Sequence, residues 1–396
     1  MSSLVWVEID GGAPERNLRE IRKGSAPGVL ACAVVKSNAY GHGVAQISSL
    51  LPSADWFGVN SLEEGLELRA RGISRPVILL GHVPLADLRA AVEADLALTV
   101  YNVETIEALA SLGTIPRQAR LHVKVETGTG RQGVLPEELE GFLRRVKGTP
   151  QVRLEGLSTH YANIEDTLDH RYAEMQISRF ADALATAERI AGPLPFVHTA
   201  CTAAALLFPS THFTMLRTGI GLYGLWPSRE TMISAREKGG RVPELAPVLS
   251  WKTRIVQVKR LPEGSYVGYG CSYRTTRGTV VGVLPVGYSD GYDRALGNRA
   301  HVLVRGHRAP VIGRICMNLC MVDLTDVPGA ALEDEVVLLG SSGDERISAE
   351  TMAEWAGTIN YEIVSRISPL LPRMITGSGR TGARRASSRI RGISRG

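Results

Sequence analysis

A lysine directly after an apolar run is the first feature of this sequence that could do chemistry. Residues 29–35 are apolar and rich in β-branched side chains, which is typical of a fully buried strand, and Lys36 follows without a turn. A partly desolvated lysine has a lowered pKa and becomes a nucleophile towards a carbonyl. The alternative is a lysine whose stem covers apolar surface while its ammonium reaches solvent. The polar, glycine-broken stretch from Asn38 through Tyr40 to Gly43 favours a site at the strand end.

Other polar residues follow later apolar runs in the same way. They are Thr127 to Gly133, His160 and Tyr161, Cys201 and Thr202, and Arg217 to Ile220. Backbone amides beside Gly219, together with the Thr202 hydroxyl, can form a site for an anion. A ligand with both an aldehyde and a phosphate would suit such a site, because its aldehyde could react with Lys36 and its phosphate could bind the Thr202 hydroxyl and the amides beside Gly219.

The apolar runs that carry these residues number eight, and amphipathic segments alternate with them. The runs cover residues 29–35, 56–59, 77–80, 96–100, 121–125, 152–158, 196–199 and 216–222, and helices are expected at 62–71, 103–112, 136–146 and 169–190. Eight strands, each followed by a helix, over about 240 residues predict a (β/α)8 TIM barrel, whose active site lies at the carboxyl ends of the strands. An open doubly wound sheet is the alternative, but no G-x-G-x-x-G follows the first strand.

After residue 246 the pattern changes to strands separated by Gly and Pro turns. Strands are expected at 249–261, 279–286, 301–305, 311–315, 321–324 and 336–339, followed by one helix at 349–357. This pattern predicts a mainly β C-terminal domain. We therefore divide the chain into a barrel over residues 1–240, a β domain over 241–376 and a tail over 377–396, with the linker between 233 and 247.

The composition narrows the class of protein. The 396 residues are 44% hydrophobic and 21% charged, which is ordinary for a globular protein. No apolar run reaches the roughly 18 residues of a membrane span, and the N-terminus lacks the features of a signal peptide. We therefore expect a cytoplasmic protein. Five cysteines without a C-x-x-C pair indicate neither a disulfide framework nor a zinc site.

The net charge of +5 comes from the C-terminal tail. Residues 377–396 hold six arginines and no acid, which leaves 39 basic and 40 acidic residues in the rest of the chain. The tail is rich in Gly, Ser and Arg, and we expect it to be disordered. Contact with RNA or acidic lipid is the alternative to a solvated tail; we expect no nucleic-acid or membrane partner.

Seven motifs, in the same order along the chain, resemble those of the alanine racemase family. They are AVVKSNAYGHG (33–43), KVETGTGRQG (124–133), LRTGIGLYG (216–224), VGYGCSY (267–273), PVGYSDGY (285–292), GRICMN (313–318) and NYEI (360–363). The resemblance runs from about Trp6 to Arg373. It implies an isomerase that depends on pyridoxal 5′-phosphate, has a barrel and a β domain, and interconverts L-alanine and D-alanine for peptidoglycan.

By this resemblance, Lys36 and Tyr269 would be the two acid/base groups on opposite faces of the substrate Cα, and Lys36 would hold the cofactor as a Schiff base. Two groups are needed because a single base returns the proton to the face it left. A tyrosine with a pKa of about 10 is a poor base at neutral pH, and His160 is the candidate neighbour that favours its phenolate. Arg217 would face the pyridine nitrogen and keep it unprotonated, because a guanidinium only donates hydrogen bonds.

The resemblance also assigns binding residues. Arg131 would support the phenolic oxygen of the cofactor and the carboxylate of the substrate. Lys124 is at the position where the family often carries a carbamylated lysine that orients this arginine, and an unmodified lysine is the alternative. The phosphate would be bound by Tyr40, Thr202, Gly219, Ile220 and Tyr361, and the substrate entrance would be lined by Tyr288 and Met317.

Three residues differ from those that family members usually have. Cys201 replaces an asparagine, which removes an amide contact to the cofactor. Thr202 replaces a serine and keeps the hydroxyl. Asn318 replaces an aspartate, which removes a negative charge near the mouth of the site. Tyr361, by contrast, is what alanine-specific members tend to have, so the strictness of the preference for alanine stays open.

The resemblance implies a homodimer with shared active sites, since the tyrosine that matches Tyr269 reaches the site from the other subunit. The alternatives are a racemase of another or several amino acids, a barrel-type pyridoxal-phosphate decarboxylase, and a non-catalytic pyridoxal-phosphate-binding protein. The decarboxylase usually has an acidic partner for the pyridine nitrogen, which Arg217 does not match. The non-catalytic protein lacks a β domain and any counterpart of Tyr269.

Overall fold

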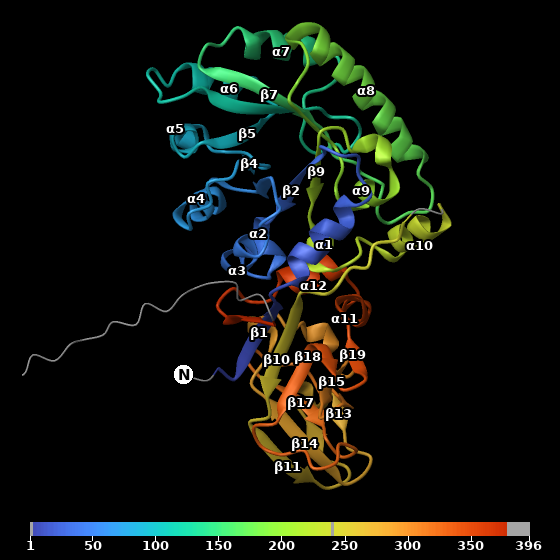
Figure 1. Cartoon of the computed structure of the whole chain (residues 1–396). Coiled ribbons are helices and arrows are strands. Elements are labelled where there is room, and N and C mark those ends of the chain that lie inside the picture. The colour runs from blue at the N-terminus through green and yellow to red at the C-terminus, as the bar shows by residue number, and fades with distance from the viewer. Residues whose placement is uncertain (1–2, 239–240, 378–396) are drawn as a thin grey trace, which may run out of the picture.

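The computed structural model describes residues 3–238 and 241–377, and it consists of a barrel and a mainly β part (Figure 1). Eight parallel strands form a nearly closed barrel in the order β8-β7-β6-β5-β4-β3-β2-β9. They are β2 (Leu30–Val34), β3 (Trp56–Val59), β4 (Val77–Leu79), β5 (Leu96–Val100), β6 (Ala119–Lys124), β7 (Val152–Ser158), β8 (Phe196–His198) and β9 (Met215–Thr218). Each lies on one of the eight apolar runs, so the predicted (β/α)8 barrel is confirmed.

Helices cover the outside of the barrel, because each presents one apolar face to the strands. In helix α7 the buried side chains Leu139, Phe142, Leu143 and Val146 are three or four residues apart, so they share one face. The helices of this part are α1 (Ala13–Arg22), α2 (Lys36–Tyr40), α3 (Val44–Ser49), α4 (Leu62–Ala70), α5 (Leu88–Glu93), α6 (Val103–Ala110), α7 (Leu139–Lys147), α8 (Arg171–Ala191), α9 (Thr202–Leu207) and α10 (Arg229–Glu237), with 3-10 turns η1 (Leu85–Asp87), η2 (Pro209–Thr211) and η3 (Ile220–Tyr223). The four helices predicted here correspond to α4, α6, α7 and α8.

The second part is mainly β, as predicted. Its largest sheet has the order β16-β15-β18-β10-β1-β20 with β19 paired to β18, a second sheet has the order β11-β14-β17, and β12 pairs with β13. The strands are β1 (Val5–Asp10), β10 (Leu249–Arg254), β11 (Gln257–Leu261), β12 (Tyr266–Val267), β13 (Tyr273–Arg274), β14 (Thr279–Leu284), β15 (His301–Val304), β16 (His307–Pro310), β17 (Cys320–Asp323), β18 (Glu335–Ser342), β19 (Glu345–Ile347) and β20 (Arg373–Thr376). The other elements are helices α11 (Ala349–Ala356) and α12 (Asn360–Ser365) and turns η4 (Tyr269–Cys271), η5 (Tyr288–Asp290) and η6 (Arg294–Leu296).

Strand β1 comes before the barrel in sequence but belongs to the sheet of the second part. It pairs antiparallel with β10 and parallel with β20, so the first and last described strands are neighbours. The buried amide of Asn17 on α1 adds a link, because it donates to the carbonyl oxygens of Leu222 (3.0 Å) and Ala246 (2.8 Å). The division at residue 240 stays a prediction. The tail, apart from Gly377, lies outside the described residues.

Two predicted strands of the second part were wrong in detail. The run at 249–261 is two strands, β10 and β11, which belong to different sheets. The strand expected at 311–315 is only an isolated bridge from Val311 to Val322, and β16 lies just before it.

Two further differences affect the elements nearest the predicted site. The strand expected at 216–222 ends at Thr218, because Gly219 turns the chain into η3. Helix α12 was not predicted, because six residues are too few to show a helical period in the sequence.

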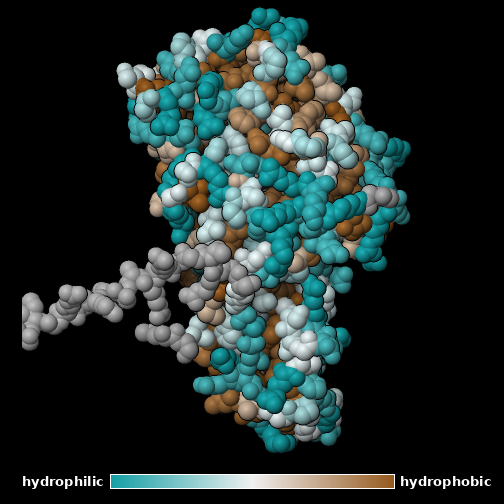
Figure 2. All heavy atoms as spheres, in the orientation of Figure 1, coloured by the Kyte–Doolittle hydropathy of each residue, from teal (hydrophilic) through white to brown (hydrophobic). Residues whose placement is uncertain are grey.

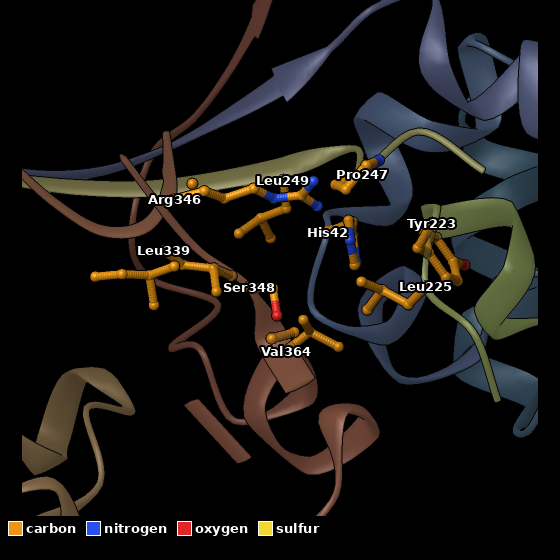
Figure 3. A pocket seen from close by; sticks show the side chains of 12 residues that line it. His42, Tyr223, Leu225, Pro247, Leu249, Leu339, Arg346, Ser348 and Val364 are labelled. Atoms are coloured by element: carbon orange, nitrogen blue, oxygen red, sulfur yellow. The ribbon is translucent and has the colours of Figure 1, made fainter. Parts of the chain in front are cut away.

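A small cavity of about 30 Å³ lies where the barrel meets the second part. Figure 3 shows His42 and Tyr223 from the barrel beside Leu339, Ser348 and Val364 from the second part. The ring of His42 stacks on Tyr223 with centroids 4.3 Å apart. A volume of this size holds about one water molecule, so we regard it as a packing gap between the two parts.

The surface is mixed in character. Figure 2 shows hydrophilic side chains over most of one face, with smaller hydrophobic areas among them. Within residues 3–238 and 241–377, no helix is both long and apolar enough to cross a lipid bilayer. All five cysteines are free; Cys32 and Cys320 are buried and Cys271 is exposed.

Candidate functional site

A cavity of about 740 Å³ opens at the carboxyl ends of the barrel strands. This volume is typical of a site for a cofactor or a small molecule. The predicted residues that line it are Lys36, Tyr40, Lys124, Arg131, His160, Thr202, Arg217, Gly219, Ile220 and Tyr361. The structure therefore brings together every predicted site residue of the barrel and adds Tyr361 from helix α12. The other lining residues are Val34, Asn60, Leu80, Thr99, Gln132, Ser158, Thr159, Glu165 and Cys201.

The turn α2 after Lys36 is left-handed. Ser37, Asn38, Ala39 and Tyr40 have φ values of 54°, 52°, 54° and 53°. Each non-glycine residue in this region costs roughly 1–2 kcal/mol, so the surrounding contacts must hold the turn in place. Asn38 supplies one such contact, since its side-chain oxygen accepts from the N–H of Val44 at 2.9 Å. The turn puts both Lys36 and Tyr40 into the cavity.

Positive charge dominates this cavity. Its described lining includes four cationic side chains, Lys36, Lys124, Arg131 and Arg217, and one carboxyl, Glu165. Like charges close together destabilise one another, and an anion relieves the repulsion. The cavity therefore suits a ligand that carries phosphate or carboxylate groups.

The two lysines have lowered pKa values. Burial is the main cause for Lys36, and the nearby charge of Arg131 lowers its pKa further. Burial followed by Arg131 and Arg217 lowers the pKa of Lys124 to about 8. Each amine therefore loses its proton more readily than an exposed lysine, as a nucleophile towards a carbonyl requires.

The guanidinium of Arg217 is buried and held by barrel acceptors. Nη1 donates to Nδ1 (2.6 Å) and the carbonyl oxygen (2.5 Å) of His198, and Nη2 donates to the carbonyl oxygens of Thr159 (2.7 Å) and Thr199 (3.1 Å). In the part of the chain that the structure describes, no acceptor pairs with Nε. Because this side chain also lines the cavity, the free N–H can serve a ligand acceptor there.

The bonds of Arg217 fix the protonation of two histidines behind it. Since arginine only donates, Nδ1 of His198 must accept, and the proton of that ring lies on Nε2. Nε2 then donates to Nδ1 of His122 at 2.8 Å. Burial is the main reason why both pKa values are lowered, that of His122 to about 3. Both histidines are therefore neutral and orient Arg217.

His160 also lies in this cluster of positive charge. Burial first, and the charges of Arg217 and Arg131 next, hold its pKa well below the usual value. Its carbonyl oxygen accepts from Gln176 at 3.1 Å, which fixes the backbone at the end of β7. The imidazole is therefore neutral and can accept a hydrogen bond.

Hydroxyl groups and a glycine form the opposite end of the cavity. Thr202 Oγ1 accepts from the N–H of Gly219 at 3.1 Å, so its own hydrogen is free to donate. A Cβ on Gly219 would lie 2.5 Å from the Tyr40 hydroxyl, so the close approach requires glycine here. The rings of Tyr40 and Tyr361 are 6.1 Å apart. This donor set suits an anion, as the sequence predicts.

Arg131 is carried by a loop that Glu126 organises. The carboxylate of Glu126 accepts from the N–H groups of Gly128 (2.6 Å), Thr129 (2.5 Å) and Arg131 (3.1 Å). These bonds lower the pKa of Glu126 despite its partial burial. The loop is therefore held by one ionised side chain.

Tyr269, Tyr288 and Met317 do not line the cavity of their own chain. Their exposed fractions are 73%, 44% and 57%, which is high for such side chains. Tyr288 and Met317 lie close together, since the Tyr288 N–H donates to the carbonyl oxygen of Cys316 and the Ser289 N–H donates to that of Met317. Tyr269 lies in the same region, because a Cβ on the preceding Gly268 would be 3.2 Å from the backbone nitrogen of Arg314. Asn318 lies in the same region and donates to Ser289 Oγ at 2.7 Å.

Sequence reasoning missed two groups of residues near the cavity. His122 and His198 lie inside predicted strands, and nothing in the pattern pairs them with Arg217. Glu165 lies five residues after His160 in a loop, and its charge alone is no signal of a site. The one available indication was that this loop follows the carboxyl end of a barrel strand, β7.

The chain matches known proteins along almost its whole length. The family model described as "Alanine racemase, N-terminal domain" matches residues 9–227, and "Alanine racemase, C-terminal domain" matches residues 248–375. Alanine racemase from Leptospira interrogans serogroup Icterohaemorrhagiae serovar copenhageni is 38% identical over 374 residues, covering 93% of this chain and 95% of that protein. Alanine racemase from Desulfovibrio desulfuricans is 40% identical over 373 residues, covering 93% of this chain and 97% of that protein.

A solved structure agrees with this similarity. The crystal structure of alanine racemase from Bacillus anthracis with bound L-Ala-P has a TM-score of 0.89 to this chain at 35% identity. The similarity covers 96% of this chain and 97% of that chain.

Proposed function

The chain belongs to the alanine racemase family of isomerases, and we propose that it interconverts L-alanine and D-alanine with pyridoxal 5′-phosphate as its cofactor. The observation that carries the proposal is a single cavity lined by a lysine of lowered pKa, three other cations and an end formed by hydroxyl groups. We further propose a cytoplasmic enzyme that supplies D-alanine for peptidoglycan, as the resemblance implies.

The residues of the cavity fit this cofactor. Lys36 would attack its aldehyde, the free Nε–H of Arg217 would donate to its pyridine nitrogen, and Arg131 would support its phenolic oxygen. Tyr40, Thr202, Gly219, Ile220 and Tyr361 would hold the phosphate. When bound, the cofactor would supply an electron-withdrawing ring that stabilises a substrate that has lost its α-proton.

Lys36 and Tyr269 would exchange the proton on opposite faces of the substrate Cα. The lowered pKa of Lys36, caused mainly by burial, makes its Nζ give up a proton more readily than an exposed lysine does, as an acid/base group requires. Tyr269 Oη would act from the other face, and neutral His160 keeps one ring N–H that would donate a hydrogen bond to the phenolate of Tyr269 and so favour it. Arg217 stays charged and cannot accept a proton, which favours racemisation over chemistry that needs a protonated pyridine.

We propose a homodimer in which the second part of one chain completes the site of its partner. Support comes from the exposure of Tyr269, Tyr288 and Met317, which lie together outside the cavity of their own chain. Exposed aromatic side chains that gather in one region are typical of protein interfaces. Tyr288 and Met317 would then line the entrance for the amino acid.

Lys124 is proposed to be carbamylated. With a pKa of about 8, part of the amine is neutral at physiological pH and can add CO2, releasing one proton to solvent. The resulting negative charge would be attracted to Arg131, whose planar donors suit a carbamate as well as a carboxylate. It would hold Arg131 towards the carboxylate of the substrate.

The family match over residues 248–375 favours this function over the non-catalytic cofactor protein, which lacks a β domain. Arg217 in the cavity favours it over the decarboxylase, which usually has an acidic partner for the pyridine nitrogen. A racemase of another or several amino acids is the remaining alternative. Two differences from the usual family residues support this alternative: Cys201 lies in the cavity, and Asn318 lies near the exposed tyrosines.

The proposal is tested by incubating the purified protein with pyridoxal 5′-phosphate and each of several L-amino acids, followed by chiral chromatography. We expect D-alanine to form faster than any other D-amino acid. Lys36→Ala should form none, whereas Lys147→Ala, on the exposed face of α7, should match the wild type. Formation of another D-amino acid with no D-alanine would contradict the proposed substrate.

A further inference from the structure

Glu165 is the one carboxyl of the described cavity lining, and it lies at the hydroxyl-rich end. Its Oε2 accepts from the Tyr361 hydroxyl at 3.0 Å, and its Oε1 accepts from Cys201 Sγ at 3.7 Å. Tyr361 is one of the residues proposed to bind the phosphate of the cofactor, and Cys201 directly precedes Thr202, which is another. Burial is the main cause that raises the pKa of Glu165, and the charge of Asp166 raises it further.

The bond from Tyr361 to Glu165 competes with an anion for the same hydrogen. A tyrosine hydroxyl has one hydrogen to donate, and an ionised carboxylate only accepts. With Glu165 ionised, Tyr361 therefore presents only lone pairs to a phosphate. With Glu165 protonated, the carboxyl can donate to the Tyr361 oxygen, and the hydrogen of Tyr361 can turn to the phosphate.

We propose that Glu165 takes up one proton from solvent when the phosphate group binds, and that this proton turns the Tyr361 hydroxyl from Glu165 to the phosphate. The proposal rests on the proposed cofactor and adds a positioning residue to its site. A phosphate carries about −1.5 to −2 charges at neutral pH, so an ionised carboxylate beside it would be strongly repelled. Protonation removes this repulsion and adds a donor.

The other titratable groups that face Glu165 come from three elements and its own loop. They are Tyr361 on α12, Cys201 before α9, Tyr40 on α2, and Asp166. Burial raises the pKa of Cys201 to about 12 and those of both tyrosines above their usual value, so all three stay neutral near neutral pH. Asp166 is exposed, and partial burial and the charge of Glu230 raise its pKa. Among these groups, Glu165 is the carboxyl that lines the cavity, so it is the one whose charge a bound phosphate can change.

Calorimetry with two cofactor analogues tests the proposal. Pyridoxine 5′-phosphate has the phosphate but no aldehyde, so it cannot react with Lys36. Pyridoxine has neither the aldehyde nor the phosphate, so it serves as the control without phosphate. The full-length protein, freed of cofactor with hydroxylamine, is titrated in two buffers of different ionisation enthalpy across neutral pH, which gives the number of protons taken up. The variants are Glu165→Gln, Tyr361→Phe and, as a matched carboxyl, Asp166→Asn.

We expect the wild type and Asp166→Asn to take up close to one proton more than Glu165→Gln on binding pyridoxine 5′-phosphate. For each unit by which the pH rises, the affinity of the wild type for pyridoxine 5′-phosphate should fall by up to about tenfold more than the affinity of Glu165→Gln. The amide of the variant does not titrate and donates to Tyr361 at every pH. Tyr361→Phe keeps the Glu165 carboxylate and its repulsion by the phosphate, so it should keep the extra uptake but bind pyridoxine 5′-phosphate more weakly, because no hydroxyl turns to the phosphate. With pyridoxine, all the proteins should take up the same number of protons.

Equal proton uptake by the wild type and Glu165→Gln would overturn the proposal while leaving the proposed cofactor intact. Failure of the wild type to bind pyridoxine 5′-phosphate would overturn both. Infrared spectra of the holoenzyme provide a second readout that does not need the cofactor-free protein. A protonated-carboxyl band that Glu165→Gln lacks would support the proposal, and its absence from the wild type would overturn it.

Discussion

Lys36 has a lowered pKa because it is partly buried and because Arg131 and Arg217 add positive charge nearby. The same charges would attract the phosphate and carboxylate groups of the proposed ligands. The same cations would therefore raise the affinity of the cavity for its ligand and make the amine of Lys36 more reactive. The neutral histidines behind Arg217 keep its guanidinium in position without adding further charge.

Removal of Arg131 should shift the pH dependence of cofactor attachment. Attack on an aldehyde needs the neutral amine, so the rate rises with pH until the amine of Lys36 is deprotonated. Arg131→Gln removes a charge that lowers this pKa, so the profile should move to higher pH, by up to about one unit. The measurement is the rate of borohydride-trapped pyridoxal 5′-phosphate on Lys36 against pH.

Arg131→Lys is the matched control for this shift. It keeps the charge, so the pH profile should stay near that of the wild type. It loses the planar fork, so the KM for alanine should rise. An unchanged profile in Arg131→Gln would contradict the electrostatic role of this residue.

Helix α12 places Tyr361 in the cavity, and a glycine permits that placement. A Cβ on Gly41, at the end of α2, would lie 1.9 Å from the carbonyl oxygen of Val364 on α12. Arg373 reinforces the contact, because its Nε and Nη2 donate to the Gly41 carbonyl oxygen at 2.9 and 2.8 Å. The two elements that carry Tyr40 and Tyr361 are therefore fixed against each other.

Gly41→Ala should cost more stability than Gly28→Ala. Both glycines have a left-handed φ, 82° and 88°, but a Cβ on Gly28 would have no neighbour within 4 Å. The strain alone should cost about 1 kcal/mol in both variants, and the clash should add roughly 1–3 kcal/mol in Gly41→Ala. Thermal unfolding with and without pyridoxal 5′-phosphate measures this difference, and equal costs would contradict the tight contact between α2 and α12.

The sequence predicted the elements that have a clear hydrophobic period, and it predicted the site residues that resemble family motifs. All eight barrel strands were found because each is a short buried run. Helix α12 was missed because it is short, and β1 because its place in a distant sheet depends on pairing with β10 and β20. Glu165 and His198 were missed because their roles depend on side-chain contacts in the folded chain, with Tyr361 and Arg217 respectively, that no sequence pattern shows.

At the scale of the whole molecule, Tyr269, the second proposed base, lies outside the cavity of its own chain. Tyr269 is 73% exposed, and it lies with Tyr288 and Met317 on the second part, while Lys36 lies at the mouth of the barrel. The proposed site, which needs both groups, would therefore be completed by another copy of the chain. In a twofold dimer each site would take one group from each subunit.

Mixing two inactive variants should restore activity. A dimer of one Lys36→Ala chain and one Tyr269→Phe chain has one site with both groups and one site with neither. After full random exchange of equal amounts, about a quarter of all sites should be intact, so activity should reach about a quarter of the wild-type value. Chiral assay measures the activity, and mass spectrometry of an isotope-labelled chain measures the exchange. Proven exchange without recovered activity would contradict the shared site.

Lys36 and Tyr269 are proposed to exchange the α-proton of alanine on opposite faces, and proton NMR in D2O can follow this exchange. The protein with pyridoxal 5′-phosphate and L-alanine is followed by loss of the α-proton signal, with chiral separation of the product. We predict that D-alanine appears with deuterium at Cα while the L-alanine recovered early still carries its proton, because the group that removes the proton is not the group that delivers one. Early D-alanine that retains the substrate proton, or exchange into L-alanine with no D-alanine, would contradict the claim.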